Sequence, residues 1–250
     1  MCWPTSRGWL EVMSNERPIH RLLVVTAHPD DVDFGAAGTI ATLTDAGVEV
    51  GYCIVTDGDA GGFDPAVPRA EIPRIRREEQ TAAAKEVGVS DLRFLGYPDG
   101  AVEASLALRK DISREIRRFK PDVVMCQSPV RDFNRIYGSH PDHLASAEAT
   151  IGAVYPDARN PFTFVELMDE GFEPHSAWQI WLMGGPTPNK WVDTTAQFDR
   201  KIAALLCHAS QLPDPDAMQA RIRMWNESVA LSGGLAPGST AEAFQVVETA

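Results

Sequence analysis

The hydrophobic pattern of the first half of the chain alternates between two kinds of segment. Short, continuous apolar runs are typical of strands covered on both faces, and longer amphipathic segments between them end at Gly or Pro. The expected strands are Leu22–Ala27, Val48–Val55, Leu92–Leu95 and Asp122–Cys126, and the expected helices are Phe34–Ala46, Pro73–Val87 and Leu106–Phe119. This β-α-β-α order predicts an α/β fold, a Rossmann-like and mostly parallel sheet with helices on both faces.

The second half of the chain is less regular. Strands are expected at Phe162–Met168, Ala177–Met183, Trp191–Val192 and Ala243–Val247, and helices at Thr195–Ala209 and Ala217–Ala230. The aromatic-rich stretch Phe162–Trp181 is interpreted as core. No shift in composition marks a domain boundary, so we expect one domain over residues 19–250, preceded by a flexible N-terminal extension at residues 1–18.

The composition, 44% hydrophobic and 23% charged residues, is that of an ordinary globular protein. A formal net charge of −12 argues against nucleic acid and anionic membranes as partners, because both repel an acidic surface. No apolar run approaches the length that crosses a bilayer. We therefore expect a cytoplasmic protein with a small-molecule partner, and the sequence leaves a homo-oligomer open.

Two motifs combine histidine with carboxylates. Ala27-His28-Pro29-Asp30-Asp31 follows the first expected strand, and His140-Pro141-Asp142-His143 opens a helix-like segment; together they hold three of the chain's six histidines. In a parallel sheet, ligands bind beyond the carboxyl ends of the strands. The polar loops that follow expected strands are His28–Asp31, Asp57–Asp59, Tyr97–Asp99 and Ser128–His143, and we expect them to meet at this edge, where the active site would lie.

The spacing within each motif suits a metal site. His28 and Asp31, three residues apart around a tight turn, can face one point, whereas Asp30 projects differently and is free to touch a water molecule. Imidazole and carboxylate are both zinc ligands, and a hydrolytic zinc uses three protein ligands and one water. His140 and His143 fall on one helical face, so one can bind a metal while the other stands over the substrate.

At these residues the sequence resembles the LmbE-like, or PIG-L-type, de-N-acetylases, a family that includes N-acetylglucosaminyl-inositol deacetylases. The resemblance runs from about residue 22 to residue 211 by the order and spacing of motifs. It implies that His28, Asp31 and His143 hold one Zn²⁺ per chain. A site of two histidines and one carboxylate also accepts Fe²⁺ or Co²⁺.

The same resemblance assigns roles around the metal. Asp30 would be the general base, and His140 the acid or oxyanion-stabilising group, with Asp142 orienting His140. Arg76, Asp99 and Tyr137 are the candidates for binding substrate. Each of these three has a plainer interpretation: Arg76 can pair with Glu79 on a helix surface, Asp99 can belong to a turn, and Gly138 and Ser139 separate Tyr137 from the second motif.

Other polar residues have structural interpretations. We expect His208 to make a structural hydrogen bond. The loop Asp57–Gly62 lacks the order of a phosphate-binding loop and is interpreted as a rim loop. Substrate choice is expected in rim loops at Asp57–Arg69, Gln127–Tyr137 and Tyr155–Met183.

The expected function is a zinc-dependent hydrolase that cleaves an N-acyl, in particular N-acetyl, amide of an amino-sugar-like small molecule, using a metal-activated water. One alternative is an amidase of a larger cysteinyl–sugar conjugate, and another is a two-metal phosphoesterase. A third alternative is a non-catalytic metal- or carbohydrate-binding module. Asp30 argues against this last one, because a carboxylate beside the ligands suits a base and is not needed for binding.

Overall fold

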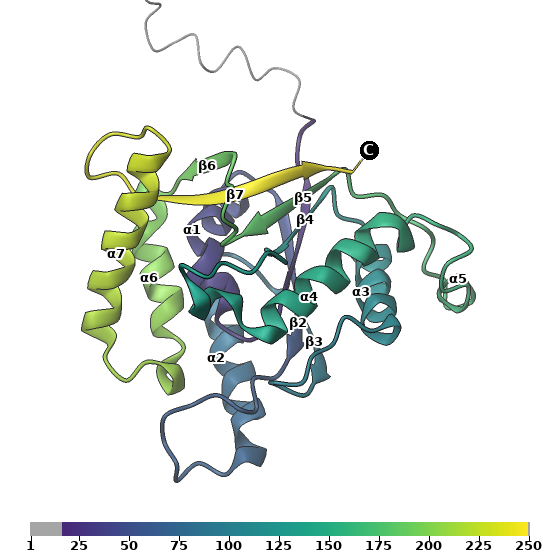
Figure 1. Ribbon diagram of the computed structural model, residues 1–250, viewed down its shortest axis with the longest axis horizontal. Coiled ribbons are helices and arrows are strands. Elements are labelled where there is room, and N and C mark those ends of the chain that lie inside the picture. The colour runs from purple at the N-terminus through teal and green to yellow at the C-terminus, as the bar shows by residue number, and fades with distance from the viewer. Residues whose placement is uncertain (1–16, 250) are drawn as a thin grey trace, which may run out of the picture.

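The computed structural model describes residues 17–249, so nearly all of the predicted extension at residues 1–18 lies outside the described residues. Figure 1 shows the arrangement of the helices and strands. The strands are β1 (Arg21–Thr26), β2 (Glu49–Thr56), β3 (Asp91–Tyr97), β4 (Val123–Gln127), β5 (Gln179–Met183), β6 (Lys190–Asp193) and β7 (Ala241–Glu248). The α-helices are α1 (Asp31–Asp45), α2 (Ile72–Glu86), α3 (Leu106–Phe119), α4 (Pro141–Gly152), α5 (Glu166–Asp169), α6 (Phe198–Leu206) and α7 (Pro215–Ser232).

Within residues 17–249 the strands form one seven-stranded sheet in the order β3-β2-β1-β4-β5-β7-β6. The five strands from β3 to β5 pair in parallel, and β7 pairs antiparallel with both β5 and β6. The predicted α/β fold with a mostly parallel sheet is therefore confirmed.

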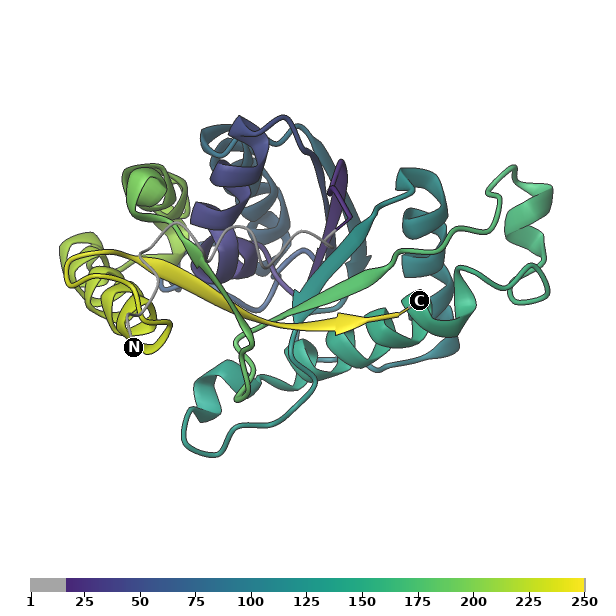
Figure 2. The same ribbon diagram turned by 90° about the horizontal axis from the view of Figure 1, so that it is seen from above.

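The central strand β1 explains why its sequence is a continuous apolar run. Leu22 and Val24 pack on the layer formed by α1, α2 and α6, whereas Leu23 and Val25 pack on α3 and α4. All four side chains are at most 1% exposed. Figure 2 shows these two layers on opposite sides of the sheet. A strand covered on both faces needs apolar residues at every position, so the period-2 alternation disappears.

The order of the strands reverses at β1. The chain moves outward from β1 through β2 to β3, and then returns so that β4 lies on the other side of β1. The connections that leave the carboxyl ends of β1 and β4 therefore go in opposite directions. This leaves a crevice between them, which is where α/β sheets of this kind bind their ligands.

A buried ion pair ties the last strand to the first helix. Lys201 Nζ in α6 lies 2.6 Å from Glu242 Oε1 in β7, and both side chains are at most 1% exposed. Lys201 also donates to the Phe34 carbonyl oxygen (2.7 Å), and Glu242 accepts the main-chain N–H groups of Gly38 and Thr39. The pair thus fixes α1, whose first residue is Asp31.

The predicted strand Phe162–Met168 is wrong. This segment contains turns and the short helix α5. The assignment of Phe162–Trp181 to the core is wrong at Phe162, which is 86% exposed, but correct at Leu167 and Trp181, which are buried. The main chain curls around the buried guanidinium of Arg117, which donates to the carbonyl oxygens of Asn160 and Thr163. Carbonyl groups that converge on one side chain cannot pair with a neighbouring strand.

The predicted rim loop Tyr155–Met183 is also wrong for most of its length. It follows α4, whose amino end lies at the carboxyl edge of the sheet, and it leads to the start of β5 at the opposite edge. The predicted helix Thr195–Ala209 is a 3₁₀ turn followed by α6, which ends at Leu206. Among the described helices, none has both the length and the apolar character needed to span a membrane.

Candidate metal centre and active site

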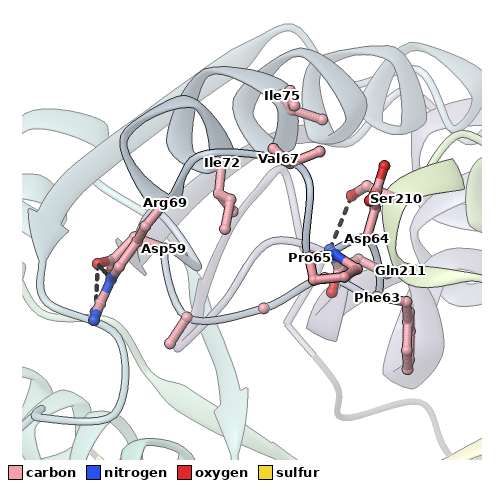
Figure 3. A pocket seen from close by; sticks show the side chains of 13 residues that line it. Asp59, Phe63, Asp64, Pro65, Val67, Arg69, Ile72, Ile75, Ser210 and Gln211 are labelled. Carbon is pink, nitrogen blue, oxygen red and sulfur yellow. Dashed lines mark hydrogen bonds and ion pairs between the residues drawn. The ribbon is translucent and has the colours of Figure 1, made fainter.

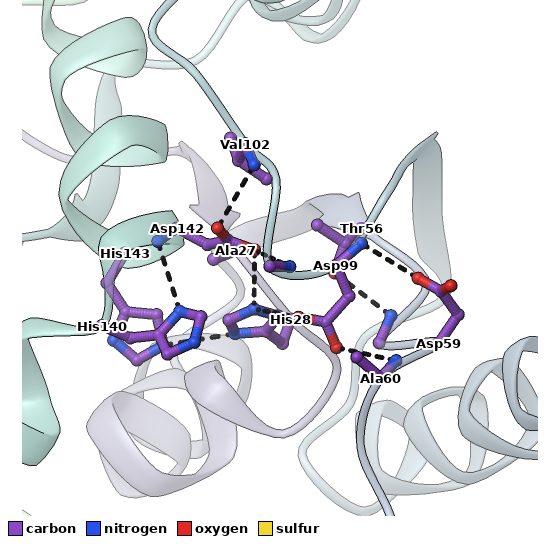
Figure 4. Close-up of polar contacts among 12 residues, drawn as sticks. Ala27, His28, Thr56, Asp59, Ala60, Asp99, Val102, His140, Asp142 and His143 are labelled. Atoms are coloured by element: carbon purple, nitrogen blue, oxygen red, sulfur yellow. Dashed lines mark hydrogen bonds and ion pairs between the residues drawn. The ribbon is translucent and has the colours of Figure 1, made fainter.

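The polar loops that follow β1, β2, β3 and β4 meet at the carboxyl edge of the sheet, as predicted. Figure 4 shows His28, which follows β1, between Asp99, which follows β3, and the side chains at the start of α4. The loop after β2 joins them, because Asp99 N–H donates to Asp59 Oδ1 (2.9 Å) and Ala60 N–H donates to Asp99 Oδ2 (3.2 Å). Four separate loops therefore come together at this edge of the sheet.

The turn at His28–Asp31 separates the two neighbouring carboxylates. Asp31 Oδ2 accepts the His28 main-chain N–H (2.7 Å), which folds Asp31 back toward His28. Asp30 has φ 87° and ψ −27°, a left-handed conformation. Because of this conformation, Asp30 and Asp31 point in different directions although they are adjacent in the sequence.

His28, Asp31 and His143 present one triangle of ligand atoms. His28 Nδ1 lies 3.2 Å from His143 Nε2, and Asp31 places one oxygen 3.3 Å from the first nitrogen and the other 3.0 Å from the second. In a tetrahedral zinc site with ligands at about 2.0–2.1 Å, neighbouring ligand atoms are roughly 3.3 Å apart. The spacing and chemistry of these three groups therefore fit a zinc ion.

The carboxylate of Asp31 dominates the electrostatics of the two histidines beside it. Burial alone would lower the pKa of His28, but the charge of Asp31 and the hydrogen bonds to Asp31 and Asp99 outweigh it and raise the pKa to about 11. The pKa of His143 is raised in the same way, by Asp31 against burial. Burial would raise the pKa of Asp31, yet the two histidines hold it well below its usual value.

The other ring nitrogen of His28 faces two further carboxylates. His28 Nε2 lies 3.1 Å from Asp99 Oδ1 and 3.3 Å from Asp142 Oδ2. These three residues are themselves close enough to hold a cation. However, Asp142 already accepts the main-chain N–H groups of Gly100 (2.7 Å) and Val102 (3.2 Å), so it is satisfied by the protein. A carboxylate that accepts the second N–H of a metal-binding histidine fixes its tautomer and orientation.

The carboxylate of Asp142 points to His28, so the predicted orientation of His140 by Asp142 can run only through the main chain of Asp142. The Asp142 carboxylate is fully buried, and it points from the first turn of α4 toward His28 and the Gly100–Val102 main chain. Its link to His140 runs through the backbone, because the Asp142 N–H donates to His140 Nδ1 (3.2 Å). The geometry makes Asp142 a partner of His28.

His140 is the least constrained imidazole of the cluster. Its ring centroid lies 5.0 Å from that of His28 and 5.5 Å from that of His143, a third grouping that is close enough to bind a cation. Burial and the neighbouring His28 lower the pKa of His140, which favours the neutral ring. Since Nδ1 accepts a hydrogen bond, the proton of the neutral ring lies on Nε2, where it is available as a donor.

The buried side chain of Arg76 holds Asp30 in place. Arg76 is 4% exposed, and its Nη2 donates to Asp30 Oδ2 (3.2 Å) and to the Pro29 carbonyl oxygen (2.6 Å). Burial raises the pKa of Asp30 to about 6, although the guanidinium of Arg76 acts in the opposite direction. The loop after β2 approaches Arg76 so closely that a Cβ at Gly58, which has φ +64°, would lie 2.1 Å from Nη1.

The structure tests the plainer interpretations of the predicted substrate-binding residues Arg76 and Asp99, and it shows where Tyr137 lies. The suggested surface pair of Arg76 with Glu79 is wrong, because Glu79 accepts hydrogen bonds from the main chain and hydroxyl of Ser210. Tyr137 is 77% exposed, and its hydroxyl accepts a hydrogen bond from Arg135 Nε (3.3 Å) on the rim. The placement of Asp99 beside His28 is more than a plain turn requires. Their contacts with substrate stay predictions.

Two buried residues beside Asp30, Asp33 and Gln80, belong to neither histidine motif and were not predicted from the sequence. Gln80 Oε1 accepts the Asp30 main-chain N–H (2.7 Å), and Gln80 Nε2 donates to Asp33 Oδ2 (2.9 Å). His208 Nε2 lies 2.8 Å from the same oxygen, which confirms the structural hydrogen bond expected of His208. The available signal was helical spacing, since Gln80 lies four residues after Arg76 on the same face of α2.

A cavity lies beside this cluster under the loop after β2. It has a volume of about 450 Å³, and Figure 3 shows it between this loop, α2 and the segment that follows α6. Its walls combine the apolar side chains of Ile72 and Ile75 with the polar side chains of Ser210 and Gln211. Asp59 lines the cavity and also contacts Asp99, so the cavity adjoins the His28 cluster.

Fold and site together define an α/β protein with a histidine–carboxylate group, able to hold a metal, at the crevice of a parallel sheet. Residues 23–154 match the PIG-L family, described as GlcNAc-PI de-N-acetylase. This match spans more than half of the chain and includes both histidine motifs. The chain belongs to this family, which confirms the resemblance.

Individual relatives are similar over most of the chain. Diacetylchitobiose deacetylase of Thermococcus kodakarensis is 32% identical over 78% of this chain and 72% of its own length. A probable N-acetyl-alpha-D-glucosaminyl L-malate deacetylase 2 of Bacillus anthracis is 31% identical over 80% of this chain and 83% of its own length. The solved structure of N,N'-diacetylchitobiose deacetylase from Pyrococcus horikoshii has a TM-score of 0.86 and 30% identity, covering 97% of this chain and 90% of that one. Since these relatives are named deacetylases, enzymes that act on N-acetyl amides, the prediction of an enzyme is confirmed.

Proposed function

We propose that this protein is a zinc-dependent deacetylase that removes the acetyl group from the nitrogen of an N-acetylglucosamine-containing small molecule. The observation that carries the proposal is the triangle of His28, Asp31 and His143, with the carboxylate of Asp30 beside it. The names of the relatives support the substrate class, because they share N-acetylated glucosamine and differ in what is attached to it.

The chain supplies a complete set of groups for amide hydrolysis. His28 Nδ1, His143 Nε2 and the carboxylate of Asp31 would hold the ion. A bound zinc ion polarises the amide carbonyl and makes water a stronger nucleophile at neutral pH. Asp99 and Asp142 orient His28 through its Nε2, as carboxylates do for metal-binding histidines.

Asp30 and His140 act on the reacting atoms. Asp30 is ionised at neutral pH and is held by Arg76. It accepts a proton from the attacking water while the oxygen of that water bonds to the acetyl carbon. His140 Nε2–H donates a hydrogen bond to the oxygen on which negative charge develops. When the C–N bond breaks, the proton taken by Asp30 passes to the departing nitrogen, and the products are acetate and a free amine.

A panel of substrates tests this proposal. The zinc-loaded protein is incubated with N,N'-diacetylchitobiose, with N-acetylglucosamine joined to malate or inositol, and with a phosphate monoester, and released acetate, amine and phosphate are measured. We expect acetate and amine in equal amounts from at least one N-acetylated sugar and no phosphate. Phosphate release without acetate, at two metal ions per chain, would replace the proposal with the two-metal phosphoesterase.

A further inference from the structure

Asp30 occupies a backbone conformation that needs support. Its φ of 87° lies in the left-handed region, which residues with a side chain adopt only at an energetic cost. The α1 helix begins at the next residue, so the Asp30 N–H has no partner within that helix. Instead it donates to Gln80 Oε1 in α2 at 2.7 Å.

Gln80 is itself held in place by two buried residues. Its Nε2 donates to Asp33 Oδ2 (2.9 Å), and His208 Nε2 lies 2.8 Å from the same oxygen on the other side. Gln80, Asp33 and His208 are each 0% exposed. The chain of contacts therefore runs from His208, which follows α6, through Asp33 in α1 and Gln80 in α2, to the main chain of Asp30 without meeting solvent.

Two residues of α2, one helical turn apart, form hydrogen bonds with Asp30. Arg76 binds the carboxylate, and Gln80, four residues later, binds the main chain. An amide suits the second point, because it offers an acceptor to Asp30 and a donor to Asp33 without adding a charge. Two fixed points determine both the position and the direction of a side chain, whereas one point leaves rotation free.

We propose that Gln80, secured by Asp33 and His208, is a positioning residue that keeps Asp30 in the left-handed conformation and so aims its carboxylate at the reacting water. The inference rests on the proposed function for the role of Asp30. A catalytic group misplaced by about 1 Å costs on the order of a hundredfold in rate. Loss of the Gln80 contact therefore affects turnover, whereas the three metal ligands stay in place.

The test compares two buried glutamines in the full-length, zinc-loaded protein. Gln80→Met removes both hydrogen bonds at similar volume. Gln179→Met is the matched control, because Gln179 is also buried and bonded, to Glu248 and Trp181, but lies at the start of β5 at the opposite edge of the sheet. Gln80→Asn keeps the amide on a shorter side chain, and serves if the Met variant does not fold.

Two readouts are measured for each variant. We expect the Asp30 amide proton, followed by NMR hydrogen exchange, to be protected in the wild type and the control, and to exchange at least about tenfold faster in the Gln80 variants. With N,N'-diacetylchitobiose we expect kcat to fall by about tenfold or more, with KM within about threefold and zinc content unchanged. The control should change neither readout.

Unchanged protection of the Asp30 amide in a folded Gln80 variant would overturn the inference. So would faster exchange without a loss of kcat, because Gln80 would then be only a structural residue. A wild-type protein that deacetylates no sugar of the panel contradicts the proposed function itself. The exchange result would still decide whether Gln80 holds Asp30.

Discussion

The two carboxylates behind His28 give a prediction that can be worked out from distances. Asp99→Asn removes the charge 3.1 Å from His28 Nε2 but keeps the shape of a side chain that is 9% exposed. Loss of such a partner typically weakens metal binding by about 10–100-fold, or roughly 1.4–2.7 kcal/mol. Because Asp142 remains 3.3 Å from the same nitrogen, we expect the lower end, about tenfold weaker zinc binding.

Zinc affinity is measured by competition with a chromophoric chelator at constant pH. Asp59→Asn is the control, because Asp59 contacts the Asp99 main chain and Arg69 rather than His28, and its affinity should stay within about twofold of the wild type. If Asp99→Asn leaves zinc affinity unchanged and raises KM instead, Asp99 binds substrate, as the sequence suggested, and the orienting role assigned to it here is refuted.

Three further perturbations follow from the same geometry. Asp30→Asn and His140→Ala should keep their zinc and lose about a hundredfold or more in kcat, and a normal turnover rate in either variant would remove that residue from the mechanism. Lys201→Met leaves its buried carboxylate partner uncompensated, so urea unfolding should show a loss of about 3–5 kcal/mol; a loss below about 1 kcal/mol would show that the pair is unimportant. Burial lowers the pKa of His208, but Asp33 outweighs it and raises the pKa above the usual 6.5, so this pair stabilises the fold fully below pH 6.5 and progressively less as the pH rises through the raised pKa. The difference in unfolding free energy between the wild type and His208→Leu should therefore shrink at high pH, and a constant difference would contradict the assignment.

The sequence predicted the first half of the fold well, because its signals there are local. The helix Leu106–Phe119 has the predicted limits: Ser105 caps its first turn, Leu108, Ile112 and Ile116 face the core, and Lys120 ends it in a left-handed conformation. The strand order could not be predicted in this way. It depends on pairings between segments far apart in the chain, which no local period records.

Aromatic content misled the prediction at Phe162–Met168. Apolar residues occur there without strand-like pairing, because the buried Arg117 binds the carbonyl oxygen of Thr163 and that of Asn160 just before the segment, and so bends the main chain. Arg117 belongs to the distant helix α3, so the sequence of Phe162–Met168 gives no sign that its main chain wraps around a buried guanidinium. An exposed Phe162 and a buried Trp181 are therefore indistinguishable by composition alone.

The site was predictable as far as its motifs reached. The spacing of His28 and Asp31 correctly indicated that they face one point, and the second motif supplied His143 to the same point. The direction of Asp142 was not predictable, since it depends on how the first turn of α4 docks against the Gly100 loop. The contact of Gln80 with Asp30 was not predicted either, because a single glutamine in a helix belongs to no recognisable motif.

The most direct test of the proposed metal centre is a zinc titration of the metal-free protein in which bound zinc and acetate release are measured in the same samples. We predict that activity rises in step with zinc and saturates at one ion per chain, and that His143→Ala neither retains zinc nor gains activity in the same concentration range. Activity that is full without metal, or a His143→Ala variant that binds zinc and turns over normally, would contradict the proposed site.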